Sequence, residues 1–230
     1  MEESVNRRVS MDSIHHLENE MLILKADISK LLSLVLESFE MSIKSLEDSN
    51  LELANRVLDL DDKIDDINRK IEDSVYQIIA RYNPLAKELR YSMTMIKFSN
   101  NLERIGDLSC NIAKKSKKYT DKNIKSIMNK DIKNMFGISL QMMKDAFKAF
   151  GERDINLAVK TWKTDNEIDR IENEIRKDAI KKIEDKDFDK ELIVPYILIA
   201  RDIERIADHA TNLCEETVYI ETSKEIHEFL

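Results

Sequence analysis

Apolar residues recur at steps of three and four over long, unbroken stretches, the first of them from Leu17 to Leu46. This spacing predicts amphipathic helices, because residues three and four apart share one face of a helix. The 230-residue sequence contains three glycines and two prolines, so few positions favour turns or sheet corners. The sequence therefore predicts an all-α protein with six long helices, over residues 17–46, 53–78, 84–118, 123–150, 154–183 and 188–220.

Single residues mark two of the predicted helix ends. Asn83 followed by Pro84 is typical of an N-cap and the first helical position. Gly151 predicts the C-terminal cap of the fourth helix. Outside the helices we expect a flexible N-terminal segment over residues 1–16 and a C-terminal tail over residues 221–230.

The second half of the sequence repeats the first. The segment ERIGD at residues 103–107 matches ERIAD at residues 204–208, a shift of 101 residues. Upstream, the two copies match at a shift of 104 residues, and a loop before the third helix of each copy can absorb the difference. Long helices joined by short loops favour antiparallel bundles. We therefore expect two tandem, internally duplicated antiparallel three-helix bundles, in residues 17–120 and 121–220. The upstream matches are Leu53, Ala54, Asp61, Ile64, Asp65, Ile67 and Ile71 with Leu157, Ala158, Asp165, Ile168, Asp169, Ile171 and Ile175.

Acidic residues form four pairs one helical turn apart, two in each copy. One such pair is typical of a solvated helix face, but recurrence at matched positions indicates a shared role. Like charges at this spacing repel, and partly buried carboxylates need positive compensation. Either Arg104 and Arg205 form ion pairs with them, or a metal ion fills each site, to which Asn111 and Asn212 can add amide oxygens. Oxygen ligands without histidine or cysteine favour Mg²⁺, Ca²⁺, Mn²⁺ or iron over structural zinc. The candidate metal ligands are Asp61, Asp65, Glu103, Asp107, Asp165, Asp169, Glu204 and Asp208.

Charge and cysteine content exclude several classes of function. The formal net charge of -8 argues against nucleic acid as a partner. The two cysteines form no Cys-x-x-Cys motif, which is typical of reduced thiols in a cytosolic protein. The longest apolar run, Leu192 to Ala200, is about half of what a bilayer span needs. With no secretory signal visible, we expect a cytoplasmic protein without a transmembrane segment.

The acidic pairs lie within four characteristic segments, LDDKIDDI and LERIGDLSCNIAK in the first copy, TDNEIDRI and IERIADHATNLCE in the second. These doubled segments resemble the signatures of the PhoU family, and the resemblance extends from about Leu17 to Ile220. It implies two three-helix bundles whose acidic sites hold a divalent metal or a multinuclear iron cluster. Iron is the leading choice, with Mg²⁺, Mn²⁺, Zn²⁺ or Ca²⁺ as alternatives. The first copy departs from the second at Gly106, which replaces an alanine, and at Leu108-Ser109, which replaces His209-Ala210.

The resemblance also implies a regulatory adaptor that bridges a phosphate ABC transporter ATPase and a sensor histidine kinase. Such an adaptor represses the phosphate-starvation (Pho) response when phosphate is plentiful, and homodimers are expected. The alternatives are a paralogue acting in metal binding or phosphate-transport control, a metal-binding bundle of another role, and a structural coiled coil. A di-iron oxidase or ferritin-like enzyme needs Glu-x-x-His motifs, which the sequence lacks. No nucleophile elbow or phosphate-binding glycine loop appears, so we expect no enzymatic activity.

Overall fold

The computed structural model describes residues 11–230, and residues 1–10 lie outside the described part of the chain. Within the described residues there is no β-strand, and the prediction of an all-α protein is confirmed. The helices are α1 (Met11–Glu47), α2 (Leu51–Tyr82), α3 (Ala86–Lys118), α4 (Lys130–Glu152), α5 (Ile155–Glu184) and α6 (Ile193–Thr222).

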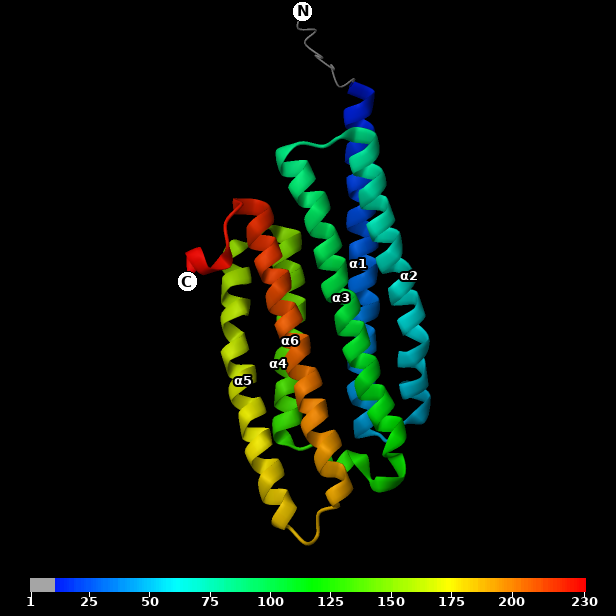
Figure 1. Cartoon of the computed structure of the whole chain (residues 1–230), viewed down its shortest axis with the longest axis vertical. Coiled ribbons are helices and arrows are strands. Elements are labelled where there is room, and N and C mark those ends of the chain that lie inside the picture. The colour runs from blue at the N-terminus through cyan, green and yellow to red at the C-terminus, as the bar shows by residue number, and fades with distance from the viewer. Residues whose placement is uncertain (1–10) are drawn as a thin grey trace, which may run out of the picture.

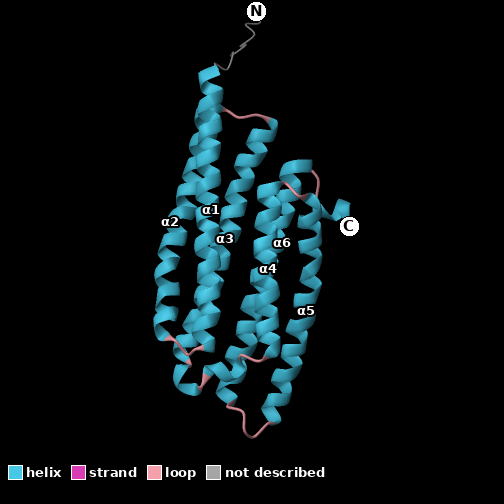
Figure 2. Ribbon diagram, turned by 180° about the vertical axis from the view of Figure 1, so that it is seen from behind, coloured by secondary structure: helices cyan, strands magenta, loops and turns pink. Residues whose placement is uncertain are grey.

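The six helices form two antiparallel three-helix bundles that stand side by side (Figure 1). Helices α1, α2 and α3 pack on one another, and so do α4, α5 and α6. The bundles meet mainly through α3 and α6, with a smaller contact between α1 and α4. Seen from behind, short loops join successive helices at the ends of the bundles (Figure 2). The predicted boundary between residues 120 and 121 falls in a 3₁₀ turn, η1 (Thr120–Lys122), between the two bundles.

Most residues of the predicted apolar stripes form a core that extends across both bundles, and Val57 and Leu60 belong to a second, smaller cluster within the first bundle. In α1, Leu24, Ile28 and Val35 have no solvent exposure. Between the bundles, the ring of Phe39 in α1 meets Phe136 in α4 edge-on, with centroids 5.0 Å apart. Because this apolar packing continues from one bundle into the other, the two copies of the repeat fold against each other.

Polar contacts line the seam between α3 and α6. Lys115 Nζ lies 2.5 Å from Asp202 Oδ2, and both side chains are largely buried. Nearer the middle of α3, Asn101 Oδ1 accepts a hydrogen bond from Asn212 Nδ2 at 3.1 Å. The same oxygen lies 2.9 Å from His209 Nδ1. These contacts fix the register of α3 against α6, because each polar group finds its partner in only one alignment of the helices.

The two predicted caps are wrong. Asn83 ends α2 in the left-handed conformation, with φ 47°, and donates its N–H to Ile79 O. The next helix begins only at Ala86, with Leu85 in extended conformation as its N-cap, so Asn83 ends one helix and does not begin the next. Gly151 lies inside α4, and the cap is Arg153, with φ 58°.

The predicted ends of the chain are also corrected. Residues 11–16, expected to be flexible, belong to α1, while residues 1–10 of that prediction lie outside the described residues. The expected tail is structured, because the 3₁₀ turn η4 (Ile226–Phe229) packs back onto the core with Ile226 only 1% exposed. The ring of His227 meets Trp162 of α5 edge-on, with centroids 5.3 Å apart.

The fourth helix is shorter than predicted. Two 3₁₀ turns, η1 and η2 (Ile124–Ile127), occupy the segment where it was expected to begin. α4 starts after Asn129, whose side chain accepts a hydrogen bond from Ile132 N. A fixed N-cap at Asn129 therefore sets the start of the helix.

Removing the seam lysine tests the role of the buried ion pair. We expect Lys115→Met to lower the free energy of unfolding by about 3 kcal/mol, because Asp202 is left buried without a partner. The matched double variant Lys115→Met/Asp202→Leu should recover most of that loss. Urea unfolding at pH 7.5 measures both, and a double variant no more stable than the single one would contradict the assignment.

Candidate metal-binding carboxylate sites

The first carboxylate site comprises Asp61 and Asp65 on α2 with Glu103 and Asp107 on α3. Burial raises the pKa of Glu103, and the neighbouring Asp107, Asp65 and Asp61 raise it further. Burial likewise raises the pKa of Asp65, with Asp61 and Asp107 adding to the effect. The four carboxylates of the first site therefore lie close enough to influence one another electrostatically.

The second carboxylate site comprises Asp165 and Asp169 on α5 with Glu204 and Asp208 on α6. Burial, followed by the charges of Asp208 and Asp169, raises the pKa of Asp165 to about 6. Burial and the charge of Asp208 are the largest causes that raise the pKa of Glu204 to about 7. Near neutral pH, part of this site is therefore poised between the protonated and the charged forms.

Apolar packing between the paired helices brings the acids together. Ile64 and Ile168 occupy matched positions between the two acids of each aspartate pair, and neither has solvent exposure. In the first copy α3 carries Gly106 at this level, where an added Cβ would lie 3.1 Å from Ile64 Cδ1. The missing side chain thus lets Ile64 pack directly on the backbone of α3, between Glu103 and Asp107.

Within residues 11–230, one carboxylate oxygen in each site is buried and accepts no hydrogen bond, although the Cys110 thiol lies beside the Asp61 carboxylate. These atoms are Asp61 Oδ1 and Asp165 Oδ1, at positions that match in the repeat. A buried, unpaired acceptor is costly, so such an atom calls for a partner such as an ordered water or an ion. The two atoms occupy matched positions, so an ordered water or a cation at each site would satisfy them in the same way.

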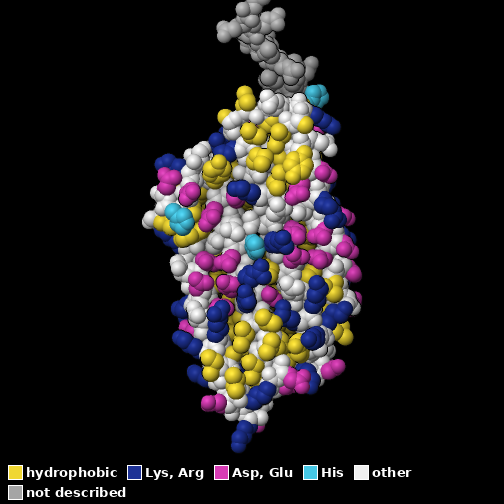
Figure 3. All heavy atoms as spheres, viewed as in Figure 1, with side chains coloured by type: hydrophobic (Ala, Val, Ile, Leu, Met, Phe, Trp, Pro, Cys, Tyr) yellow, Lys and Arg dark blue, Asp and Glu magenta, His cyan; other side chains and the backbone are white. Residues whose placement is uncertain are grey.

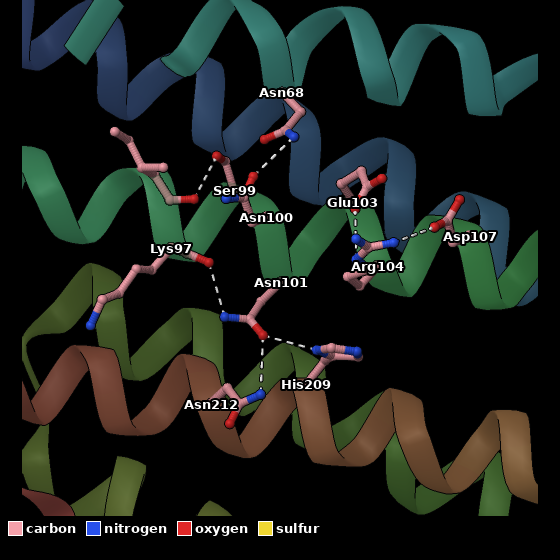
Figure 4. A network of polar contacts seen from close by, with 11 residues as sticks. Asn68, Lys97, Ser99, Asn100, Asn101, Glu103, Arg104, Asp107, His209 and Asn212 are labelled. Carbon is pink, nitrogen blue, oxygen red and sulfur yellow. Dashed lines mark hydrogen bonds and ion pairs between the residues drawn. The ribbon is translucent and has the colours of Figure 1, made fainter. Parts of the chain in front are cut away.

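The two arginines that were predicted as alternative charge partners behave differently. Arg104 Nη1 lies 3.2 Å from Asp107 Oδ2, and Arg104 Nε lies 3.5 Å from Glu103 Oε2, so the predicted ion pairs are present (Figure 4). Arg205 forms no ion pair with any acidic side chain of the described residues. It acts on the second site only at longer range, where its charge lowers the pKa of Asp208 against the larger effect of burial.

Asn212, predicted to add an amide oxygen to the second site, makes its side-chain contact elsewhere. Asn212 and His209 both bind Asn101 in the seam (Figure 4). Burial and then Arg205 and Arg104 lower the pKa of His209 to about 4, so its ring is neutral. Among the described residues, no three acidic, histidine or cysteine side chains converge closely enough to enclose one ion. The carboxylates of each site therefore have to turn toward a shared ion to bind it, as expected for groups that repel one another.

Sequence reasoning missed Glu172, which is 5% exposed on α5. Its charge is among the causes that raise the pKa of Glu204, so it belongs beside the second site. Arg176 donates two hydrogen bonds to Glu172, both to Oε1. A signal existed in the sequence, because residue 172 matches Asn68 in the repeat, and an acid replaces an amide there.

On the face that α3 and α6 share, charge is arranged in bands (Figure 3). Acidic side chains gather on both sides of the seam at mid-height, and basic side chains lie between them. Apolar side chains gather near the two ends of this face. Exposed apolar residues of these two helices include Leu89 and Met93 at the start of α3 and Val194 and Leu198 at the start of α6.

Comparisons with known proteins agree with this architecture. The sequence-family model described as PhoU domain matches residues 28–116 and 132–217 of the chain. The chain is similar to phosphate-specific transport system accessory protein PhoU homolog 1 of Thermotoga maritima, with 54% identity over 94% of this chain and 93% of that protein. The crystal structure of PhoU from Pseudomonas aeruginosa aligns over 90% of this chain and 99% of its own, with a TM-score of 0.83 and 23% identity.

A second solved structure is similar over a comparable length. The phosphate transport system regulatory protein PhoU from Streptococcus pneumoniae aligns over 91% of this chain and 98% of its own. Its TM-score is 0.80 at 25% identity. Within residues 11–230, no helix is both long enough and apolar enough to cross a bilayer.

The raised pKa values predict that stability depends on pH. The pKa values of Asp165 and Glu204 are 3.8 and 4.5 in the unfolded chain but about 6 and about 7 in the fold. Both carboxyls therefore stay protonated to a higher pH in the folded state. Their contribution to stability is therefore present at low pH and is lost as pH rises through about 4 to 7.

The double variant Asp165→Asn/Glu204→Gln removes this dependence. In EDTA, we expect it to be more stable than the wild type at pH 7.5, with the difference shrinking toward pH 5. Urea unfolding at several pH values measures the difference, and a gap that does not change with pH would be incompatible with the raised pKa values.

Proposed function

The chain belongs to the PhoU family, and we propose that it is a regulatory accessory protein of a phosphate-specific transport system. In this proposal it acts in the cytoplasm as an adaptor between a phosphate ABC transporter ATPase and a sensor histidine kinase. By joining them it keeps the phosphate-starvation response off while phosphate is plentiful. The family consists of accessory and regulatory proteins of phosphate transport and is not an enzyme family.

Similarity to a named relative supports the role most directly. The Thermotoga maritima protein, which carries the name of a phosphate-specific transport accessory protein, matches over nearly the full length of both chains. The match includes both bundles, so both are available in one chain for the two contacts of an adaptor.

Exposed apolar side chains support docking at both ends of the α3–α6 face. Met93 and Val194 occupy matched positions in the repeat and are 47% and 59% exposed. Leu89 and Leu198 extend these two apolar areas. Such areas on a surface otherwise rich in charge are typical of protein contacts, either with the two proposed partners or with a second copy in a homodimer.

We further propose that the carboxylate sites bind a divalent metal or an iron cluster. The observation that supports this most is the pair of unpaired buried oxygens, Asp61 Oδ1 and Asp165 Oδ1. All candidate donors are oxygens, which suits Mg²⁺, Mn²⁺, Ca²⁺ and iron. When bound, the metal would neutralise the carboxylates and hold α2 to α3 and α5 to α6. The residues that would hold it are Asp61, Asp65, Glu103 and Asp107, then Asp165, Asp169, Glu204 and Asp208.

Deleting the gene tests the regulatory role. In a strain without the protein, grown in ample phosphate, we expect phosphate-starvation transcripts to rise several-fold, because the repressing link is lost. Quantitative transcript measurement reads this out, with the deletion strain complemented by the wild-type gene as control. Transcripts that stay at the wild-type level would reject the role and indicate a paralogue acting in phosphate uptake or metal handling.

Elemental analysis tests the metal sites. We expect purified protein loaded with Fe²⁺ or Mn²⁺ to retain metal through gel filtration, and the joint variant Asp107→Ala/Asp208→Ala to lose most of it. The control Asp66→Ala/Glu174→Ala removes two exposed acids from α2 and α5 and should retain the metal. Wild-type protein that holds no metal after loading would rule out this part of the proposal.

A further inference from the structure

We propose that the seam between α3 and α6 binds an acidic segment of a partner protein, with Arg201 and Arg205 of α6 as the side chains that hold it. This inference rests on the adaptor role in the proposed function, because it gives that role a contact surface. It does not depend on metal binding by the carboxylate sites.

A cleft of about 310 Å³ opens on this seam, between the middle of α3 and the second half of α6. Asn101 joins its two walls, because Asn101 Oδ1 accepts a hydrogen bond from Asn212 and also contacts His209 (Figure 4). Beside it, Asn100 Nδ2 donates no hydrogen bond within the described residues. Every residue that lines the cleft is an asparagine, lysine, arginine or glutamate. Small-molecule pockets are mostly apolar, so this lining suits a polar segment of protein better.

Arg201 and Arg205 extend the α6 wall of the cleft. Arg205 precedes His209 by four residues and Asn212 by seven, and Arg201 precedes Arg205 by four. Residues at these spacings share one face of a helix, so both arginines lie in the row that meets α3 at the seam. The charges of Arg205 and of Arg104 on α3 both lower the pKa of His209. Basic groups from the two helices therefore surround the same part of the seam.

The two arginines of α6 have charge to offer a partner. Both are exposed, and within residues 11–230 neither Arg201 nor Arg205 forms an ion pair with an acidic side chain. Like charges one helical turn apart repel, so an anion that bridges them is stabilising. A guanidinium binds a carboxylate through two parallel hydrogen bonds, which suits arginine to acidic side chains. Arg104 contributes less, because it already contacts Glu103 and Asp107.

The charges around the seam select the class of partner. Acidic side chains lie on both sides of the basic ones on this face (Figure 3). These acids and the net charge of -8 repel the phosphate backbone of nucleic acid. A symmetric dimer centred on the seam would place the arginines of one copy against those of the other. A single acidic segment fits between the flanking acids, and its charge complements the arginines.

Fluorescence anisotropy with a labelled peptide tests the binding. The probe carries a run of glutamates, and the control peptide has glutamines at the same positions. We expect the full-length protein to bind the glutamine peptide about 10-fold more weakly, because its side chains carry no charge for the arginines. Arg201→Glu/Arg205→Glu should weaken binding of the glutamate peptide by about 10-fold or more, since attraction becomes repulsion.

A matched variant controls for the change in net charge. Lys177→Glu/Lys181→Glu reverses two exposed charges at the same spacing on α5 and should leave binding unchanged. Circular dichroism verifies that each variant folds. Arg201→Gln/Arg205→Gln, which only removes charge, replaces the charge reversal if that variant does not fold, and it should weaken binding in the same direction.

Two results would overturn the inference from binding alone. The first is equal affinity for the two peptides, or an affinity for the glutamate peptide that the arginine variants do not change. The second is displacement of the bound peptide by inorganic phosphate at constant ionic strength, which would assign the arginines to a free anion and exclude the protein segment.

Transcript measurements separate this inference from the adaptor role. In ample phosphate, we expect cells that produce the Arg201→Glu/Arg205→Glu variant to raise phosphate-starvation transcripts as the deletion strain does, while the Lys177→Glu/Lys181→Glu variant represses them. Transcripts that rise in the deletion strain but stay low with the arginine variant would overturn the contact surface and leave the adaptor role standing. Transcripts that stay low in the deletion strain would overturn the adaptor role and this inference with it.

Discussion

Apolar packing between antiparallel helices holds together acidic side chains that would otherwise repel one another and move apart. Burying an isoleucine such as Ile64 or Ile168 contributes roughly 1.5–3 kcal/mol. Repulsion between two like charges one helical turn apart costs only about 0.2–0.5 kcal/mol. Burial of the carboxylates costs more than this repulsion, and it raises the pKa of Asp165 to about 6 and that of Glu204 to about 7. Because several buried apolar residues act together along each helix pair, α2 stays against α3 and α5 against α6 even though each contact brings four carboxylates together. Both candidate sites depend on this imbalance.

The features that follow from local periodicity could be predicted from the sequence. The apolar stripes and the duplication into two three-helix units appear in the fold as the spacing indicated. Helix ends were harder to predict, because Asn83 and Gly151 are compatible with several local conformations. Which conformation forms depends on neighbours such as Pro84 and on where the next helix is capped.

The differences between the two sites were missed in the sequence for another reason. Alignment of the two copies of the repeat emphasises the residues that are identical in both. Glu172 lies at a position where the copies differ, because its counterpart in the first copy is Asn68. The contrast between Arg104 and Arg205 is not visible in sequence at all, because both follow a glutamate in the same motif. Only the direction that each guanidinium takes in the fold separates them.

The packing of Ile226 and His227 has a spectroscopic consequence. Trp162 is the single tryptophan of the chain, and its indole N–H donates to Glu215 on α6 while its ring meets His227. With excitation at a wavelength that tyrosine does not absorb, the emission comes from the second bundle alone. A change in that emission thus reports on α5, α6 or the docked C-terminal segment, and events confined to the first bundle leave it unchanged.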